Sequence, residues 1–293
     1  MISVIICSIN KERLARVSEN IAQTIGVEYE ILHVDNRGTG DGICAVYNRL
    51  ASRARYPVLC FMHEDARFDT HGWGVTLSEK ALAEGSGVIG FAGSAAKSRN
   101  ISTVIHKRYA HTNFTYQPED SPQKEVWQVQ IDPEIDFTPV VVIDGMFLLV
   151  SRSAFDRVGG FDDQTFTGFH LYDLDLSTAT FAAGLTNYVC NSHQFVHFSR
   201  GDYNQTWYLE TLKYDKKWGA QLPMYVDQVS PRQIARDERY IEFAMTYHMI
   251  KRRALTLDQA RARVKADIRK YPFVFKSYYH YAIYLKYKFR NNK

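Results

Sequence analysis

The sequence predicts an α/β fold in which helices flank a mostly parallel central sheet, with a C-terminal helical extension after it. Short apolar, β-branched runs alternate with stretches of helical periodicity from residue 2 to about residue 91, which is the pattern of a parallel sheet. From about residue 230 onward the periodicity is helical only. The 293 residues, 45% of them hydrophobic, suffice for a large buried core.

The first 93 residues contain four expected strands and three expected helices. Continuous apolar runs are typical of strands buried on both faces, and they predict strands at 2–9, 30–34, 57–62 and 88–91. Apolar residues at helical spacing predict the intervening helices at 11–25, 43–53 and 75–83.

The pattern is less regular after residue 93. Residues 94–125 are polar and predict a loop, whereas residues 126–131 alternate like an edge strand. Ser153 is the expected N-cap of a short helix at 153–158. The remaining elements are strands at 140–143, 146–150, 186–190 and 195–198, and helices at 173–183, 207–218, 233–252, 257–270 and 274–290.

The net charge of +4 conceals an uneven distribution. Residues 251–293 hold 13 lysines and arginines and 2 acidic residues, a net charge of +11, while residues 1–250 carry −7. Nine aromatic residues also lie within 271–293. This composition predicts that residues 251–293 meet an anionic surface or partner.

Three interpretations of this tail remain open. A basic, aromatic helix is typical of segments that lie on an anionic membrane. Basic and aromatic residues also suit single-stranded nucleic acid, although we expect no nucleic-acid partner. The third interpretation is a helix packed on the body, with its aromatic residues inward and its basic residues in water.

The cysteines and the apolar segments indicate the cellular compartment of the protein. Four scattered cysteines without a CxxC spacing predict neither a zinc site nor a disulfide framework. The opening residues lack the basic region of a signal peptide, and no run reaches about 18 apolar residues. We expect the protein to lie in a reducing compartment, the cytoplasm. If the tail binds lipid, the protein would be a peripheral protein at the inner face of the membrane.

Polar segments follow three of the expected strands, at 8–10, 35–41 and 63–65. Ligands of open parallel sheets bind at the carboxyl ends of the strands, so these segments predict one shared site. Asp35, with Asn36 beside it, suits hydrogen bonds to a base or a ribose hydroxyl, and the alternative is a loop-forming Asx turn.

The segment His63-Glu64-Asp65 follows the third expected strand. Acidic groups at the end of a buried strand must be solvated or paired with a cation. Their oxygen atoms suit Mg²⁺ or Mn²⁺ beside a pyrophosphate, and the alternative is a solvated strand end.

Asp173 and Asp175 lie at the start of an expected helix. One carboxylate there can act as a general base while the other stabilises the helix N-terminus, and the alternative is helix capping alone. His197 ends a strand and gains a ligand role only if it meets Asp65 in space. Arg200, followed by Gly201, suits a phosphate group.

Five segments in order resemble the motifs of family 2 type glycosyltransferases with the GT-A fold, most closely a bacterial branch whose metal motif is of the His-Glu-Asp type. They are residues 2–10, 30–41, 60–65, 158–162 and 169–176. The resemblance covers about residues 1–220. It implies a GT-A domain at 1–225, with a nucleotide-binding half at 1–93 and an acceptor and catalytic half at 94–225. Residues 226–293 form the basic, aromatic helical extension.

The resemblance also implies roles for individual residues. Asp65 is the final Asp of the metal motif, His63 stands at its first acid, and His197 matches a late metal-binding His. Asp173 aligns with the catalytic base, with Asp175 nearby to shape its pKa. The nucleotide side is assigned to Ser8, Asn10, Asp35, Asn36, Glu64 and Arg200.

The implied activity is that of a metal-dependent, inverting glycosyltransferase. It would use Mn²⁺ or Mg²⁺ and a nucleotide sugar, favouring a UDP-sugar, to extend a saccharide or lipid-linked acceptor of a surface polysaccharide or lipopolysaccharide. Two alternatives remain open. One is a GT-A nucleotide-sugar-binding module without turnover, suggested by His63 and by Tyr172 at the place of a Glu. The other is a nucleotidyltransferase, which would release pyrophosphate.

Overall fold

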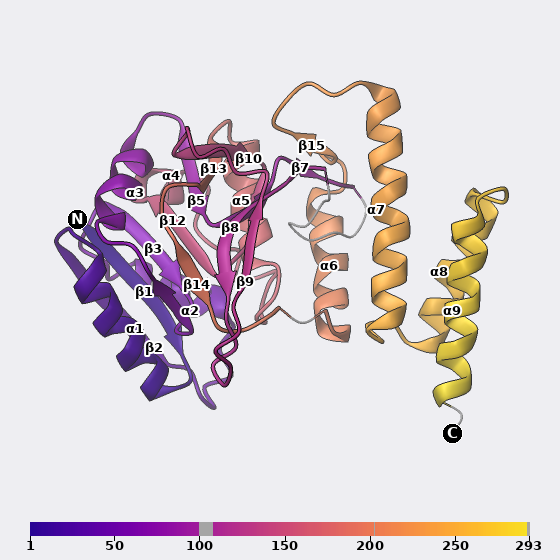
Figure 1. Ribbon diagram of the computed structural model, residues 1–293, viewed down its shortest axis with the longest axis horizontal. Coiled ribbons are helices and arrows are strands. Elements are labelled where there is room, and N and C mark those ends of the chain that lie inside the picture. Colours follow the sequence, from indigo (N-terminus) through magenta and orange to yellow (C-terminus); the bar gives the residue numbers. More distant parts are fainter. Residues whose placement is uncertain (100–107, 202, 292–293) are drawn as a thin grey trace. The chain divides into compact units, whose positions relative to one another are not determined.

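The computed structural model in Figure 1 describes residues 1–99, 108–201 and 203–291. Two compact units make up this part of the chain. The first contains residues 1–97, 108–200 and 224–227, and the second contains residues 98–99, 201, 203–223 and 228–291. The division at residue 225 that the sequence suggests stays a prediction.

A seven-stranded sheet in the order β10-β13-β5-β12-β3-β1-β2 forms the centre of the first unit. β1 pairs in parallel with β2 and β3, β13 pairs in parallel with β5, and β12 and β10 run antiparallel to their neighbours. Five of the seven strands therefore run in the same direction, which confirms the mostly parallel sheet. The strands are β1 (Ile2–Ser8), β2 (Tyr29–Asp35), β3 (Val58–Met62), β5 (Ser86–Gly90), β10 (Phe137–Val140), β12 (Phe147–Ser151) and β13 (Thr186–Cys190).

Helices pack on both faces of this sheet. Alternate residues of β1 (Ile2, Val4 and Ile6) share one buried apolar cluster with residues of α1 and α3. Phe61 of β3 points to the opposite face, where its ring centroid lies 5.0 Å from that of Tyr47 in α2. The helices of this unit are α1 (Lys11–Thr24), α2 (Ile43–Ala51), α3 (Trp73–Leu82), α4 (Arg152–Arg157) and α5 (Tyr172–Ala182).

A second sheet, in the order β11-β6-β8-β14-β4 with β9 beside β8, completes the first unit. Its pairing of β14 with β4 is antiparallel and sets His197 opposite Ala66. Residues far apart in the sequence therefore meet near the end of β3. The strands are β4 (Ala66–Phe68), β6 (Ala92–Ser94), β8 (Ala110–Tyr116), β9 (Glu125–Val129), β11 (Val142–Ile143) and β14 (Phe195–His197), while β7 (Ala96–Lys97) pairs separately with β15 (Met224–Tyr225).

The prediction of a single loop at 94–125 is wrong. This segment contains β7 and β8, and its residues 100–107 lie outside the described residues. β8 is polar, but it lies between β6 and β14 and also pairs with β9. Backbone pairing with distant strands stabilises this segment, and local periodicity does not report such pairing.

Two further local predictions are wrong. The second strand was expected to be buried, but β2 is an edge strand with one neighbour and its residues are partly exposed. The N-cap of α4 is Ser151, whose hydroxyl oxygen accepts the N–H of Ala154, rather than Ser153. Ser153 lies within the helix.

The second unit is helical, which confirms the predicted C-terminal helices. It comprises α6 (Gln205–Trp218), α7 (Pro231–Lys251), α8 (Leu257–Lys270) and α9 (Phe275–Asn291). Thr256 and Gln259 form a capping box at the start of α8. Asp267 of α8 and His280 of α9 are both buried, 3.5 Å apart. Among the described residues no helix combines the length and apolarity needed to cross a membrane.

Candidate functional site

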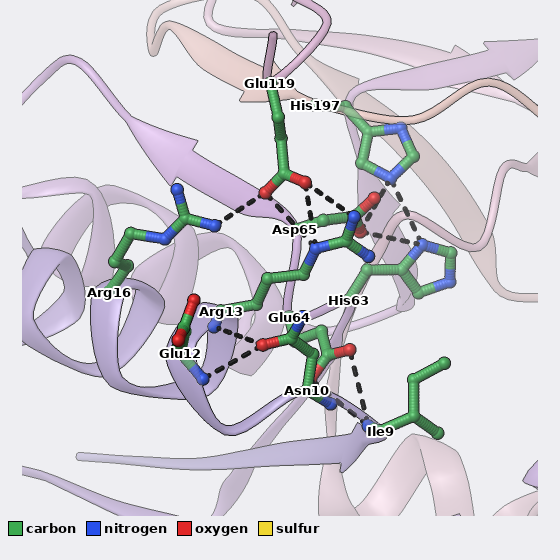
Figure 2. Close-up of polar contacts among 10 residues, drawn as sticks. All are labelled: Ile9, Asn10, Glu12, Arg13, Arg16, His63, Glu64, Asp65, Glu119 and His197. Carbon is green, nitrogen blue, oxygen red and sulfur yellow. Dashed lines mark hydrogen bonds and ion pairs between the residues drawn. The ribbon is translucent and has the colours of Figure 1, made fainter.

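Three side chains that can bind a metal converge beyond β3: His63, Asp65 and His197. His63 Nδ1 lies 3.2 Å from His197 Nε2 and 3.9 Å from Asp65 Oδ1, and His197 Nε2 lies 3.3 Å from Asp65 Oδ1 (Figure 2). Ligand atoms bound at about 2.1 Å to one divalent ion lie roughly 3.0–3.5 Å apart at right or tetrahedral angles. Two of the three separations lie in this range, and the separation of 3.9 Å between His63 Nδ1 and Asp65 Oδ1 corresponds to a wider angle at the ion. The donor types, two imidazoles and a carboxylate, also fit a metal ion.

The charge states of His63 and Asp65 suit a cation. Burial, reinforced by the neighbouring His197, lowers the pKa of His63 to about 4, so its ring is neutral at neutral pH. Burial opposes ionisation of Asp65, but the hydrogen bond and charge of His197 hold the pKa of that carboxyl well below its usual range. Neutral imidazoles and ionised carboxylates are the forms that bind metals.

Tyr172 determines the tautomer of His63. The buried Tyr172 hydroxyl donates to the carbonyl oxygen of Gly145 at 3.0 Å and lies 2.9 Å from His63 Nε2. A hydroxyl has one proton and a carbonyl oxygen only accepts, so the Tyr172 oxygen accepts from His63 Nε2–H. The lone pair of the neutral His63 ring is therefore on Nδ1, which faces Asp65 and His197.

The backbone around Tyr172 allows this close approach. A side chain at Gly145 would overlap the Tyr172 hydroxyl, so only glycine fits there. Leu171, immediately before α5, has a φ of 67°, a left-handed conformation that residues with side chains rarely adopt. This strained turn presents Tyr172 and Asp173 in the first turn of α5, and such strain concentrates at functional sites.

Two half-buried carboxyl groups, Asp144 and Asp173, lie near this turn. Asp173 accepts the N–H of Gly145 at 2.8 Å, and Asp144 accepts the N–H of Met146 at 3.2 Å. Burial, together with the charge of Asp144, raises the pKa of Asp173 to about 7. Burial also raises the pKa of Asp144. A carboxyl group that titrates near neutral pH suits proton transfer.

The turn between β1 and α1 is organised by Glu64 (Figure 2). Glu64 accepts the Ser8 hydroxyl at 2.5 Å and the N–H groups of Ile9 and Asn10 at 3.2 and 3.1 Å. The Asn10 side chain in turn caps α1 by accepting the N–H groups of Glu12 and Arg13. The structure thus brings Ser8, Asn10 and Glu64 together, with their side-chain oxygens engaged in shaping the turn.

Asp35 and Asn36 lie at the end of β2, next to this turn. The Asn36 N–H donates to the Ser8 carbonyl oxygen at 2.8 Å. The exposed Asp35 is paired with Arg37, whose hydrogen bonds lower the pKa of Asp35 to about 2. The Asn36 side chain accepts the Thr39 hydroxyl and so orders the loop. Two of the predicted strand-end segments therefore form one continuous polar edge.

A profile of the glycosyltransferase like family matches residues 3–216, which include the metal cluster and the carboxyl groups of Asp144 and Asp173. The chain belongs to the glycosyltransferase like family. The enzyme class predicted from the sequence, a glycosyltransferase, is therefore confirmed. None of the curated proteins matches the chain by sequence.

Solved structures of other glycosyltransferases resemble this family member. GalNAc-T7, solved with UDP, GalNAc and Mn²⁺, matches 69% of the chain at 10% identity and a TM-score of 0.48, and the match spans 44% of GalNAc-T7. The mannosyltransferase PcManGT of Pyrobaculum calidifontis, solved with GDP-Man and Mn²⁺, matches 99% of the chain and 86% of its own length, at 11% identity and a TM-score of 0.50. The second match confirms the predicted GT-A type α/β fold.

Three arginines of the glycosyltransferase-like domain pair with glutamates. Arg200, assigned to phosphate from the sequence, is exposed, pairs with Glu125 at 2.5 Å and stacks over the Tyr116 ring. Arg13 and Arg16 of α1 both bind Glu119 at 2.6 Å, as Figure 2 shows. The charges of Asp65 and Glu64 act on Arg13, so it is a cation near the metal cluster.

Sequence reasoning missed the structural roles of Tyr172 and Arg13. Tyr172 was identified only as a departure from the glycosyltransferase motif, and its contact with His63 spans 109 positions. Arg13 carried no signal beyond its place after the first strand. Asp175, the second predicted catalytic residue, is 2% exposed inside α5, whereas Asp173 lies at the site.

Proposed function

We propose that the protein is a metal-dependent, inverting glycosyltransferase that transfers a sugar from a nucleotide sugar to a saccharide or lipid-linked acceptor of a surface polysaccharide or lipopolysaccharide. The proposal depends on one observation in this member of the glycosyltransferase like family. Tyr172 contacts His63 of the metal cluster and the carbonyl oxygen of Gly145, and the N–H of Gly145 binds Asp173. This chain of hydrogen bonds joins the metal cluster to Asp173. A lipid-linked acceptor would place the enzyme at the cytoplasmic face of a membrane.

His63, Asp65 and His197 would hold the metal, in a site of the His-Glu-Asp type whose middle residue, Glu64, shapes the β1–α1 turn. Two of the three ligand atoms are imidazole nitrogens, which Mn²⁺ accepts more readily than Mg²⁺. The bound ion would stabilise the negative charge of the leaving diphosphate. PcManGT was itself solved with Mn²⁺ and a nucleotide sugar.

The donor would lie along the polar edge formed by the β1–α1 turn and the end of β2. Asp35 would accept hydrogen bonds from the nucleoside, with Ser8, Asn10 and Asn36 shaping the surface around it, and a UDP-sugar is the favoured donor. Arg13 and Arg200 offer guanidinium groups for the diphosphate. Binding there requires Arg13 to exchange Glu119 for phosphate oxygens.

Asp173 would act as the general base. Its carboxylate takes the proton of an acceptor hydroxyl while that oxygen bonds to the anomeric carbon from the side opposite the diphosphate. The bond between the anomeric carbon and the diphosphate oxygen breaks, and the nucleoside diphosphate leaves with both electrons. The raised pKa of Asp173 makes it a stronger base than an exposed aspartate.

The test is Asp173→Asn in a transfer assay with Mn²⁺, a panel of nucleotide sugars and saccharide acceptors. We expect transfer to fall by about 10²–10⁴-fold, the usual contribution of a general base, while Mn²⁺ and donor binding are retained. The matched control is Asp156→Asn on the exposed side of α4. Full transfer by Asp173→Asn would exclude this base. Donor binding without release of nucleoside diphosphate in the unmodified protein would instead identify a binding module.

A further inference from the structure

The outward face of α9 carries an aromatic stripe. Phe275, Tyr278, Ala282, Leu285 and Phe289 recur at intervals of three and four residues and so lie on one side of the helix. The side chains of Phe275 and Phe289 are 80% and 68% exposed, and that of Tyr278 is 49% exposed. We call these five residues the aromatic stripe.

The opposite face of α9 accounts for its packing. Ser277, His280 and Tyr284 are buried there, and α9 contacts both α7 and α8. The aromatic stripe is therefore additional to the residues that hold the helix in its unit. Phe273, just before α9, is 99% exposed and enlarges the apolar surface at that end. A contiguous exposed apolar surface of this kind marks an interaction site.

The neighbouring helix α8 presents a basic stripe. Arg261, Lys265 and Arg269 are spaced four residues apart, are exposed, and line a shallow surface groove. In the part of the chain that the structure describes, no ion pair involves any of the three. Lys286 adds an exposed cation on α9, within the segment of net charge +11.

We propose that the α8–α9 hairpin binds the surface of an anionic lipid bilayer. The aromatic stripe inserts at the boundary between headgroups and acyl chains, and the basic side chains are attracted to lipid phosphates. Charge favours this occupant, because a symmetric dimer formed through this face would bring two segments of net charge +11 together, whereas anionic lipid attracts the segment.

The arrangement of side chains separates a membrane from nucleic acid. Single-stranded nucleic acid is bound along grooves where aromatic and basic residues interleave. Here the basic stripe lies on α8, and no basic residue interrupts the aromatic stripe on α9, which is a continuous apolar band, as in interfacial helices. This inference rests on the proposed function only for its biological purpose, the approach to a lipid-linked acceptor.

The experiment is co-sedimentation of the 293-residue chain with vesicles of phosphatidylcholine alone or mixed with phosphatidylglycerol. We expect binding to the anionic vesicles that weakens with salt. Phe275→Ser combined with Phe289→Ser should lower the partition coefficient by about tenfold or more, since two phenyl rings no longer leave water. The control, Leu82→Ser, removes an apolar side chain that is 55% exposed on α3 and should bind like the unmodified protein.

Charge reversal tests the basic stripe separately. Arg261→Glu, Lys265→Glu and Arg269→Glu together should abolish the preference for anionic vesicles, while circular dichroism and the melting temperature confirm folding. Unchanged vesicle binding by either set of variants overturns the proposal. A dimer of the unmodified protein that the two Phe changes dissociate would also overturn it. Binding to single-stranded RNA in preference to vesicles would do the same. Turnover of soluble donor and acceptor is measured in parallel, so vesicle binding without turnover refutes only the proposed function.

Discussion

At the scale of single residues, the Tyr172 hydroxyl orients a metal ligand. Tyr172→Phe removes the acceptor of His63 Nε2–H and frees the ring to take the other tautomer. We expect the affinity for Mn²⁺ to fall by about 10–100-fold, as for other groups that orient metal ligands. Electron paramagnetic resonance of free Mn²⁺ measures this affinity without reference to turnover.

Tyr47→Phe is the matched control for this change. Tyr47 is buried and its ring packs against that of Tyr172, but among the described residues its hydroxyl has no hydrogen-bond partner. Its removal should leave Mn²⁺ affinity unchanged. Equal affinities in the two Phe variants would show that the Tyr172 hydroxyl has no orienting role.

The carboxyl pair predicts a pH dependence. Because the pKa of Asp173 is raised to about 7, its base form, and hence kcat, should increase as the pH rises through neutrality. Asp144→Asn removes a neighbouring negative charge that contributes to this shift. The pKa of Asp173 then falls, and the midpoint of the kcat profile should move to lower pH. An unmoved midpoint would exclude this electrostatic coupling.

At the scale of elements, one carboxylate holds the β1–α1 turn. Glu64→Ala leaves the Ser8 hydroxyl and the N–H groups of Ile9 and Asn10 without their acceptor. We expect the free energy of unfolding to fall by about 1–3 kcal/mol, measured by denaturant titration. Glu84→Ala, at an exposed position after α3, should change it by less than about 0.5 kcal/mol. A similar change in both variants would contradict this role of Glu64.

The elements also show what the sequence could and could not predict. Helices such as α1 and α3 and strands such as β3 carry strong local patterns, and the sequence located them within two residues. β8 was missed because its stability comes from pairing with distant strands. For the site, residue types pointed to Asp65 and His197, whereas the link from Tyr172 to His63 depends on tertiary packing that no spacing encodes.

At the scale of the whole molecule, metal binding should stabilise the folded state. A ligand that binds only the folded protein adds about 2.7 kcal/mol at 100 times its Kd, which is several degrees in Tm for a chain of this size. We expect Mn²⁺ to raise Tm more than Mg²⁺ does, and His197→Ala to abolish the increase. Calorimetry checks this, and an equal increase in His197→Ala would place the metal elsewhere.

The composition of the metal cluster has a thermodynamic consequence. Only one of its three ligands, Asp65, is anionic, so a bound dication would leave an excess positive charge facing the donor. The metal and the nucleoside diphosphate should then bind cooperatively, each lowering the Kd of the other by the same factor. We expect weak binding of Mn²⁺ alone and much tighter binding when UDP is present. Isothermal titrations of each ligand with and without the other would measure that factor from both sides.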